Sequence, residues 1–132
     1  MEDKNIQNYI KMVRELNKTT TLTGASNKQY RFELWGFDDF DDVKETFQGG
    51  GLYLFTKREM IDGVYRHTYL YLGRTSNYLT RYDNHHKETA IRNHESNCIG
   101  FYSMNFSSEE EMKEAEGDIL SNYIFPCNDL ND

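Results

Sequence analysis

The 132-residue sequence predicts an α+β fold, a small antiparallel β-sheet flanked by α-helices. Apolar and polar residues alternate over residues 30–35, which is typical of a strand. Two further strand-like segments, 52–56 and 65–73, are separated by a stretch that contains Asp62-Gly63, a favoured hairpin turn pair. A capping-box pattern then precedes a predicted helix over residues 108–124. These observations together indicate a hairpin-based sheet with a C-terminal helix.

The N-terminal part of the chain predicts a helix followed by a connector. Ile6, Ile10 and Val13 recur at helical spacing, so we expect an amphipathic helix over residues 3–17. Residues 17–28 are polar and contain Thr and Gly, which favours a connector.

The middle of the chain supplies the remaining elements. Residues 38–47 are acidic and ambiguous, compatible with a short helix. A helix is expected over residues 77–86, because Thr75, Ser76 or Asn77 can cap it. Residues 87–98 have no clear periodicity, and residues 98–106 predict a further strand.

Leucines alternate with tyrosines along the two hairpin strands, at Leu52, Leu54, Leu70 and Leu72. Side chains of a strand point alternately to opposite faces. If these leucines face the core, Tyr53 and Tyr71 project together from the other face of the hairpin. Tyrosine is common in strands, so two on one face is weak evidence for a site by itself.

Composition and charge limit the classes of function. The net charge of −7 argues against a general nucleic-acid binder. The charge is uneven: residues 1–48 carry −2, residues 49–106 carry +2, and residues 107–132 carry −7. Acidic residues at the start of the last helix, Glu109 to Glu111, are explained by capping and by the helix dipole. The segment with the hairpin is therefore mildly basic.

The sequence indicates a cytoplasmic protein. No run of about eighteen apolar residues is present, and Met1-Glu2-Asp3-Lys4 does not resemble the start of a secretory signal. Cys98 and Cys127 are too few for a disulfide framework, and their spacing with His94 matches no usual zinc pattern.

Two positions on the predicted helices stand out. Glu116 has Met112 and Ile119 on its own helix face, so we expect its carboxylate to be partly buried. A salt bridge, or a position at the edge of the core, would explain this without any function. Arg81 and His85 lie one turn apart on one helix face, which is most often an ordinary polar face.

Taken together, the triplets Gly51-Leu52-Tyr53 and Tyr71-Leu72-Gly73 resemble the signature of the GIY-YIG nuclease family, with Leu in place of Ile. In that family an Arg follows on the next helix and a Tyr or His stands one turn later, which matches Arg81 and His85. A later helical Glu and a closing Asn match Glu116 and Asn128. The resemblance covers about residues 49–129.

The resemblance implies a metal-dependent phosphodiester hydrolase acting on DNA. Glu116 would hold a single Mg²⁺ or Mn²⁺ ion, and Tyr53 would activate or orient the attacking water. His85 would be the base that assists Tyr53, and Arg81 would contact the scissile phosphate.

The other motif positions would support these residues. Tyr71 would donate a hydrogen bond, Asn128 would brace the site, and Arg74 would retain a cation that could contact a phosphate. Gly51 and Gly73 are the motif glycines, and Gly73 would permit close approach.

The implied organisation is an N-terminal helical extension over residues 1–28 and a GIY-YIG-like domain over residues 29–132. Cutting both strands of a duplex would require a homodimer or two visits. The alternatives are a catalytically inactive module of the same fold that binds nucleic acid or protein, and a small α+β protein in which the motif residues coincide by chance.

Overall fold

A computed structural model describes residues 18–85 and 88–128 of the chain, with the side chain of His85 outside the described part. The predicted helix over residues 3–17 lies outside the described residues. The elements, in chain order, are β1 (Thr19–Thr23), β2 (Gln29–Gly36), α2 (Phe37–Val43), a 3₁₀ turn (Lys44–Thr46), β3 (Gly51–Ile61), β4 (Val64–Thr75), α3 (Tyr78–His85), α4 (Thr89–Asn93), β5 (Cys98–Ser103) and α5 (Glu109–Leu120).

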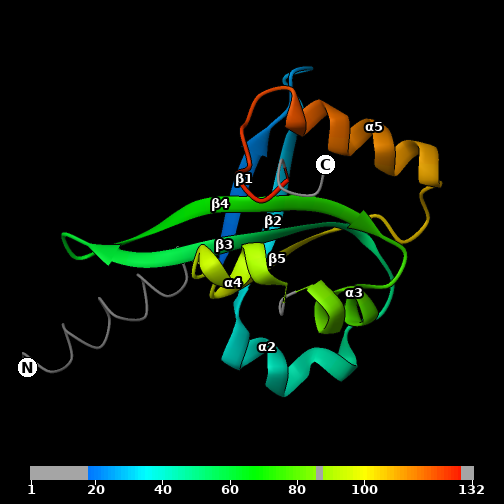
Figure 1. Cartoon of the computed structure of the whole chain (residues 1–132). Helices are drawn as coiled ribbons and strands as arrows, with labels where there is room; N and C mark the ends of the chain where they lie inside the picture. The colour runs from blue at the N-terminus through cyan, green and yellow to red at the C-terminus, as the bar shows by residue number, and fades with distance from the viewer. Residues whose placement is uncertain (1–17, 86–87, 129–132) are drawn as a thin grey trace, which may run out of the picture.

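The strands form one antiparallel sheet in the order β1-β2-β5-β3-β4 (Figure 1). Residues of α2, α3 and α4 join one buried cluster, represented by Phe40, Tyr82 and Ile91. Ala115 and Ile119 of α5 join a second cluster. The two clusters lie on opposite faces of the sheet, so the predicted α+β arrangement of a small antiparallel sheet flanked by helices is confirmed.

The prediction of a connector over residues 17–28 was wrong, because this stretch contains β1. Thr19 to Thr23 pair with β2, and Leu22 is fully buried. As an edge strand with one apolar side chain in the core, β1 carries little of the alternation that identifies a strand. The sheet therefore begins at Thr19, ahead of the predicted domain start at residue 29.

The helices differ from prediction mainly in their ends. The ambiguous acidic run 38–47 forms α2 and the 3₁₀ turn, and the aperiodic stretch 87–98 contains the short helix α4. The capping box that begins α5 is confirmed, since Ser108 and Glu111 exchange side-chain-to-backbone hydrogen bonds. α5 ends at Leu120 rather than residue 124.

A β-bulge corrects the predicted faces of β4. Phe55 pairs with Tyr71 and Thr56 pairs with Tyr69, so Leu70 has no partner on β3. The extra residue turns Leu70 to the same cluster as Tyr71, whereas Leu72 packs in the other cluster. Leu70 and Leu72 therefore do not share a face, because the bulge interrupts the alternation.

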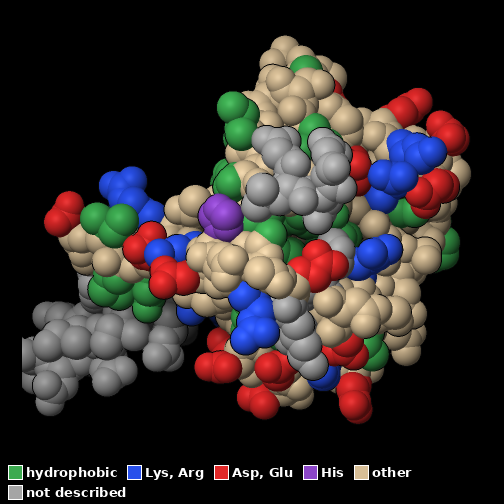
Figure 2. Space-filling view, viewed as in Figure 1, with side chains coloured by type: hydrophobic (Ala, Val, Ile, Leu, Met, Phe, Trp, Pro, Cys, Tyr) green, Lys and Arg blue, Asp and Glu red, His purple; other side chains and the backbone are tan. Residues whose placement is uncertain are grey.

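The β3–β4 hairpin extends past the end of β5 as a two-stranded arm (Figure 1). Figure 2 shows green apolar side chains on this arm, where Met60, Ile61 and Val64 are exposed. Asn97 directly precedes β5, and its side chain continues the pairing with β3 beyond that strand. It accepts from Arg58 N–H and donates to Arg58 C=O. Within the described residues, no helix combines the length and apolarity needed to cross a membrane.

His67 makes the stability of this arm dependent on pH. Burial, followed by the positive charge of Arg58, lowers the pKa of His67 from 6.5 to about 4. Its Nδ1 bonds the buried Thr56 hydroxyl at 2.8 Å, and Nε2 has no hydrogen-bond partner among the described residues. Protonation therefore leaves a charge with poor compensation.

We expect the free energy of unfolding to be unaffected by His67 above pH 6.5 and to fall as the pH is lowered toward about 4, because only the unfolded chain binds the proton in that window. His67→Gln, which keeps a partner for Thr56, should flatten this slope. Urea unfolding at several pH values measures it, and equal slopes in the two proteins would contradict the prediction.

Candidate active site

Most of the motif residues line one cleft of about 300 Å³. It lies where β3 begins and β4 ends, away from the turn of the hairpin. Its walls come from β3, β4, α3, α5 and the C-terminal turn. The lining residues are Tyr53, Tyr71, Leu72, Gly73, Arg74, Arg81, Glu109, Glu116 and Asn128. Segments that are up to 75 positions apart, Tyr53 and Asn128, thus contribute to a single polar depression.

The two tyrosines lie together on the hairpin, as the alternation predicted. The rings of Tyr53 and Tyr71 have centroids 5.8 Å apart. Gly73 pairs with Tyr53 across the ladder, and a Cβ at Gly73 would lie 2.5 Å from the Tyr53 ring. Only glycine at this position leaves room for the tyrosine ring above the strand.

Gly51, the other motif glycine, lies beside the start of α3. Its φ of +149° is in the region that favours glycine, and a Cβ there would be 2.5 Å from the Tyr78 hydroxyl. That hydroxyl donates to the carbonyl of Tyr102 at 2.7 Å. Gly51 therefore lets β3, β5 and α3 approach closely, which positions the helix that carries Arg81.

Burial keeps the Tyr53 hydroxyl protonated. Desolvation raises its pKa well above the ordinary value, and the hydrogen bond and charge of Tyr71 raise it further. The nearby Arg81 opposes this change, and Glu116 adds to it. In the environment formed by the described residues, the hydroxyl is suited to orienting a water rather than removing its proton.

Glu116 is partly buried, as its helix periodicity predicted. Its side chain is 17% exposed, and its Oε1 accepts from Arg74 Nη1 at 3.1 Å. Burial raises the pKa of Glu116, whereas the Arg74 charge lowers it. The salt bridge anticipated from the sequence is therefore present, and its cation is the residue that follows the second triplet.

Glu109 is the cleft residue that the sequence analysis missed. It was assigned to helix capping, yet it lines the cleft and its Oε1 accepts from Arg74 Nε at 2.7 Å. Glu109 precedes Glu116 by seven residues, which places both on one face of α5. That spacing is the signal that could have identified it.

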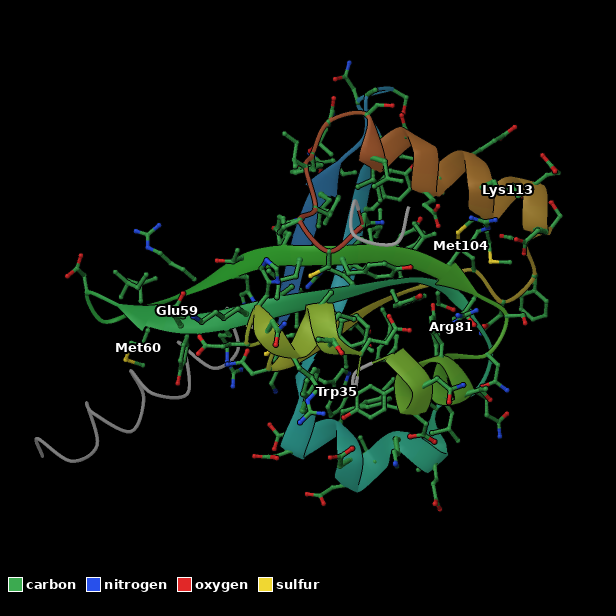
Figure 3. All side chains as sticks on the ribbon, in the orientation of Figure 1. Trp35, Glu59, Met60, Arg81, Met104 and Lys113 are labelled. Atoms are coloured by element: carbon green, nitrogen blue, oxygen red, sulfur yellow. The ribbon has the colours of Figure 1, made fainter. Side chains whose placement is uncertain are left out.

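Arg81 offers a positive charge to the cleft from the first turns of α3. Figure 3 shows Arg81 directed toward the end of the hairpin. Arg81 is exposed, and it forms no ion pair with any other residue that the structure describes. His85 lies at the end of α3, one turn after Arg81, and its side chain falls outside the described part, as does its neighbour His86.

Asn128 braces the outer edge of β4. Its Oδ1 accepts from Leu72 N–H at 2.9 Å, and its Nδ2 donates to Leu72 C=O at 2.8 Å. The preceding Cys127 N–H donates to the carbonyl of Leu70, the bulge residue, at 2.8 Å. The C-terminal turn therefore fixes the segment of β4 that carries Tyr71.

The donor set limits what the cleft could hold. No group of three His, Cys, Asp or Glu side chains close enough to form a metal cage occurs in residues 18–84 and 88–128. Glu109 and Glu116 are the cleft's carboxylates, and both contact Arg74. A divalent ion here would therefore take most of its ligands from water or a bound anion.

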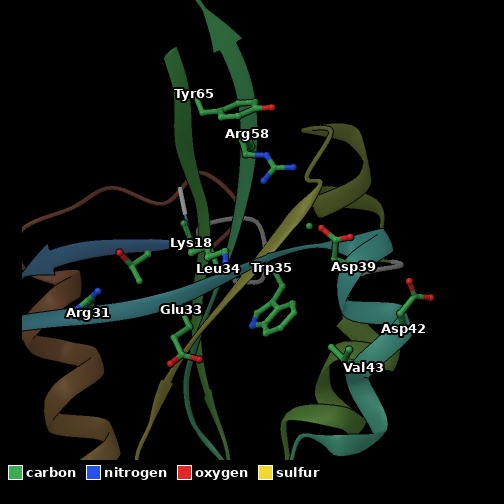
Figure 4. Close-up of a pocket in the computed structure, with 12 residues that line it drawn as sticks. Lys18, Arg31, Glu33, Leu34, Trp35, Asp39, Asp42, Val43, Arg58 and Tyr65 are labelled. Atoms are coloured by element: carbon green, nitrogen blue, oxygen red, sulfur yellow. The ribbon is translucent and has the colours of Figure 1, made fainter. Parts of the chain in front are cut away.

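A larger hollow of about 760 Å³ lies elsewhere, between β2, α2 and the hairpin arm (Figure 4). Trp35 lies in its middle, with Arg58 beside the Tyr65 ring at 5.1 Å. Asp39 and Asp42 of α2 are among its lining residues. It contains none of the motif residues, so it is separate from the candidate active site.

Comparison of the chain with protein-family models, with curated proteins and with solved structures found no match. Functional inference therefore depends on the residues of the cleft and their chemistry.

Asn128→Ala should lower the free energy of unfolding by about 1–3 kcal/mol, because the polar backbone groups of Leu72 lose both partners. Asn93→Ala is a matched control, since Asn93 is exposed at the end of α4. Urea denaturation of the two variants measures the difference. Equal stability losses would show that the two hydrogen bonds between Asn128 and Leu72 contribute nothing to stability.

Proposed function

We propose that this protein is a metal-dependent endonuclease of the GIY-YIG type that hydrolyses phosphodiester bonds in DNA. The observation that carries the proposal is the meeting of Tyr53, Tyr71, Arg81 and Glu116 in one cleft. These residues come from a hairpin and two separate helices, so their meeting does not follow from sequence proximity. A chance match of motif residues gives no reason for them to meet, so their meeting supports the proposal.

The order of elements also supports a GIY-YIG-like domain. The two triplets lie on neighbouring strands of a hairpin, the Arg lies on the following helix, and the Glu lies on the last helix. The resemblance implies a small antiparallel sheet with helices in this order. Support for the proposal thus comes from both topology and side-chain geometry.

The residues of the cleft fit a hard divalent cation. Glu116 is a partly buried carboxylate whose charge Arg74 now balances. The cleft also contains the Glu109 carboxylate, two tyrosine hydroxyls, the Asn128 amide and the Arg81 guanidinium, and the oxygen atoms among these groups suit a hard cation. When bound at Glu116, Mg²⁺ or Mn²⁺ would supply positive charge to the phosphoryl oxygens and lower the pKa of a bound water. Glu116 is the residue that would hold it.

The chain's own residues would bind and orient the reactants. The Arg81 guanidinium, which forms no ion pair with the described residues, would bind the scissile phosphate and oppose its developing negative charge. The protonated Tyr53 hydroxyl would orient the attacking water, supported by its hydrogen bond with Tyr71. Proton removal is left to His85, which remains the proposed base.

Charge indicates weak or selective binding of DNA. The whole chain carries −7, so long-range attraction to a polyanion is poor. The cleft nevertheless has Arg74 and Arg81 at its rim, and phosphate contacts depend on such local cations. One cleft cuts one strand, so cleavage of a duplex would require a homodimer or two binding events.

A catalytically inactive module is the second candidate, because Arg74 already neutralises the proposed metal ligand. In that case the cleft would bind a phosphate-containing or acidic partner through Arg81 alone. Direct measurement of cleavage separates the two functions.

We expect Glu116→Gln and Arg81→Ala each to lower metal-dependent cleavage of DNA by about 100-fold or more. Glu116→Gln removes the proposed ligand of the metal ion, and Arg81→Ala removes the cation proposed to contact the phosphate. Glu114→Gln and Arg92→Ala are matched controls on exposed faces of α5 and α4, and should cleave normally. Cleavage is followed with labelled single-stranded and duplex substrates over several metals. If the wild-type protein cuts none of these substrates with any of the metals, the nuclease proposal is wrong.

Tyr53→Phe should lower the single-turnover cleavage rate by about 10- to 100-fold without changing the shape of its pH profile between about pH 6 and about pH 9. The reason is that burial raises the pKa of Tyr53, so its hydroxyl does not titrate in this window. Tyr65→Phe, on the hairpin arm, is the control. If Tyr53 were the base, the variant would lose the rise of rate with pH.

A further inference from the structure

Arg74 bridges two carboxylates of α5, and the motif accounts for one of them. Its Nε donates to Glu109 at 2.7 Å, and its Nη1 donates to Glu116 at 3.1 Å. Figure 2 shows basic and acidic side chains gathered at the N-terminal end of α5. The guanidinium fork therefore spans two turns of the helix and uses a different nitrogen for each carboxylate.

The two carboxylates differ in exposure. The Glu109 side chain is 59% exposed and that of Glu116 is 17% exposed. Glu116 lies deeper in the cleft, whereas Glu109 lies at the rim in the first turn of α5. Glu109 can thus hold Arg74 from the rim of the cleft, while Glu116 supplies the buried carboxylate.

A divalent cation would compete with Arg74 for Oε1 of Glu116. The oxygen that Arg74 contacts, Oε1, belongs to the carboxylate proposed to hold the cation. Two positive groups in contact with one carboxylate oxygen repel each other. A cation that binds Oε1 would therefore displace Nη1 from Glu116, whereas the Nε contact with Glu109 can persist.

We propose that Glu109 is a positioning residue that keeps Arg74 at the cleft while a divalent cation replaces the guanidinium on Glu116. The inference rests on the proposed function, since it assumes a cation at Glu116. After the exchange, Arg74 remains tethered by Nε and its freed nitrogens face the cleft. The exchange thereby converts an internal counter-ion into a phosphate-binding group, which is the role that the resemblance implies for Arg74.

Helix capping alone does not explain this contact. Glu110 lies in the same first turn of α5 and contributes the same charge to the helix end, but it forms no ion pair with the described residues. Glu110→Gln is therefore a matched control for the charge and for the helix dipole.

The test is Mn²⁺ binding to the full chain, measured by electron paramagnetic resonance at constant ionic strength. Glu109→Gln should weaken Mn²⁺ binding by about fivefold, because Arg74 then pairs with Glu116 alone. Arg74→Gln should tighten binding by a similar factor, and Glu110→Gln should change it by less than about twofold. Thermal unfolding checks that each variant is folded.

A double-variant cycle isolates the role of Glu109. With Arg74→Gln in place, Glu109→Gln should weaken Mn²⁺ binding no more than Glu110→Gln does. A larger effect in that background would mean that Glu109 acts by its own charge or as a ligand, which overturns the inference. Equal effects of Glu109→Gln and Glu110→Gln in the wild-type background would overturn it as well.

Other outcomes distinguish this inference from the proposed function. Mn²⁺ binding that follows the cycle, in a protein that cleaves no DNA, would support the exchange and overturn the nuclease. Cleavage that depends on Glu116, with Mn²⁺ affinity unaffected by Glu109→Gln, would support the nuclease and overturn the exchange. If Glu116→Gln leaves Mn²⁺ binding unchanged, both fail.

Discussion

The pairing of β3 with β4 is the constraint on which the rest of the structure depends. Its register places Gly73 opposite Tyr53, and the missing side chain at Gly73 makes room for the ring. The same ladder separates two apolar clusters, so a slip by one residue would exchange tyrosines and leucines between them. Helices on both faces then attach to a surface whose pattern the ladder has already set, and the cleft forms where the hairpin meets them.

The sequence predicted the hairpin and the last helix because their signals are local. Asp62-Gly63 marks the turn, and Ser108 with Glu111 marks the helix start. It failed where a neighbour decides the structure. β1 is held by its partner β2 and has one buried leucine, and the bulge at Leu70 is stabilised by the C-terminal turn, through Cys127. Tertiary contacts of this kind leave no periodic trace in the chain.

In the cleft, too, local sequence signals identified some features, and tertiary contacts decided the others. Motif spacing selected Tyr53, Tyr71, Arg81, Glu116 and Asn128, which line the cleft. It also selected His85, whose side chain lies outside the described part, and Gly51, which lies beside the start of α3. Spacing could not reveal that Arg74 contacts both carboxylates, because an ion pair between a strand and a helix depends on how α5 packs across the sheet. Capping also supplied a sufficient explanation for Glu109, which concealed its second contact. A residue whose presence is already explained by local structure, as helix capping explains Glu109, is thus easily overlooked as part of a site.

Two asparagine side chains form the same pair of backbone hydrogen bonds at opposite edges of the hairpin. Asn97 bonds both backbone groups of Arg58 on β3, and Asn128 bonds both backbone groups of Leu72 on β4. Each amide imitates a residue of a neighbouring strand and thereby satisfies the ladder where no strand continues. An open sheet edge invites another chain to pair with it. Because Asn128 occupies both backbone groups of Leu72, that part of the β4 edge beside the cleft has no ladder groups at Leu72 left for another strand.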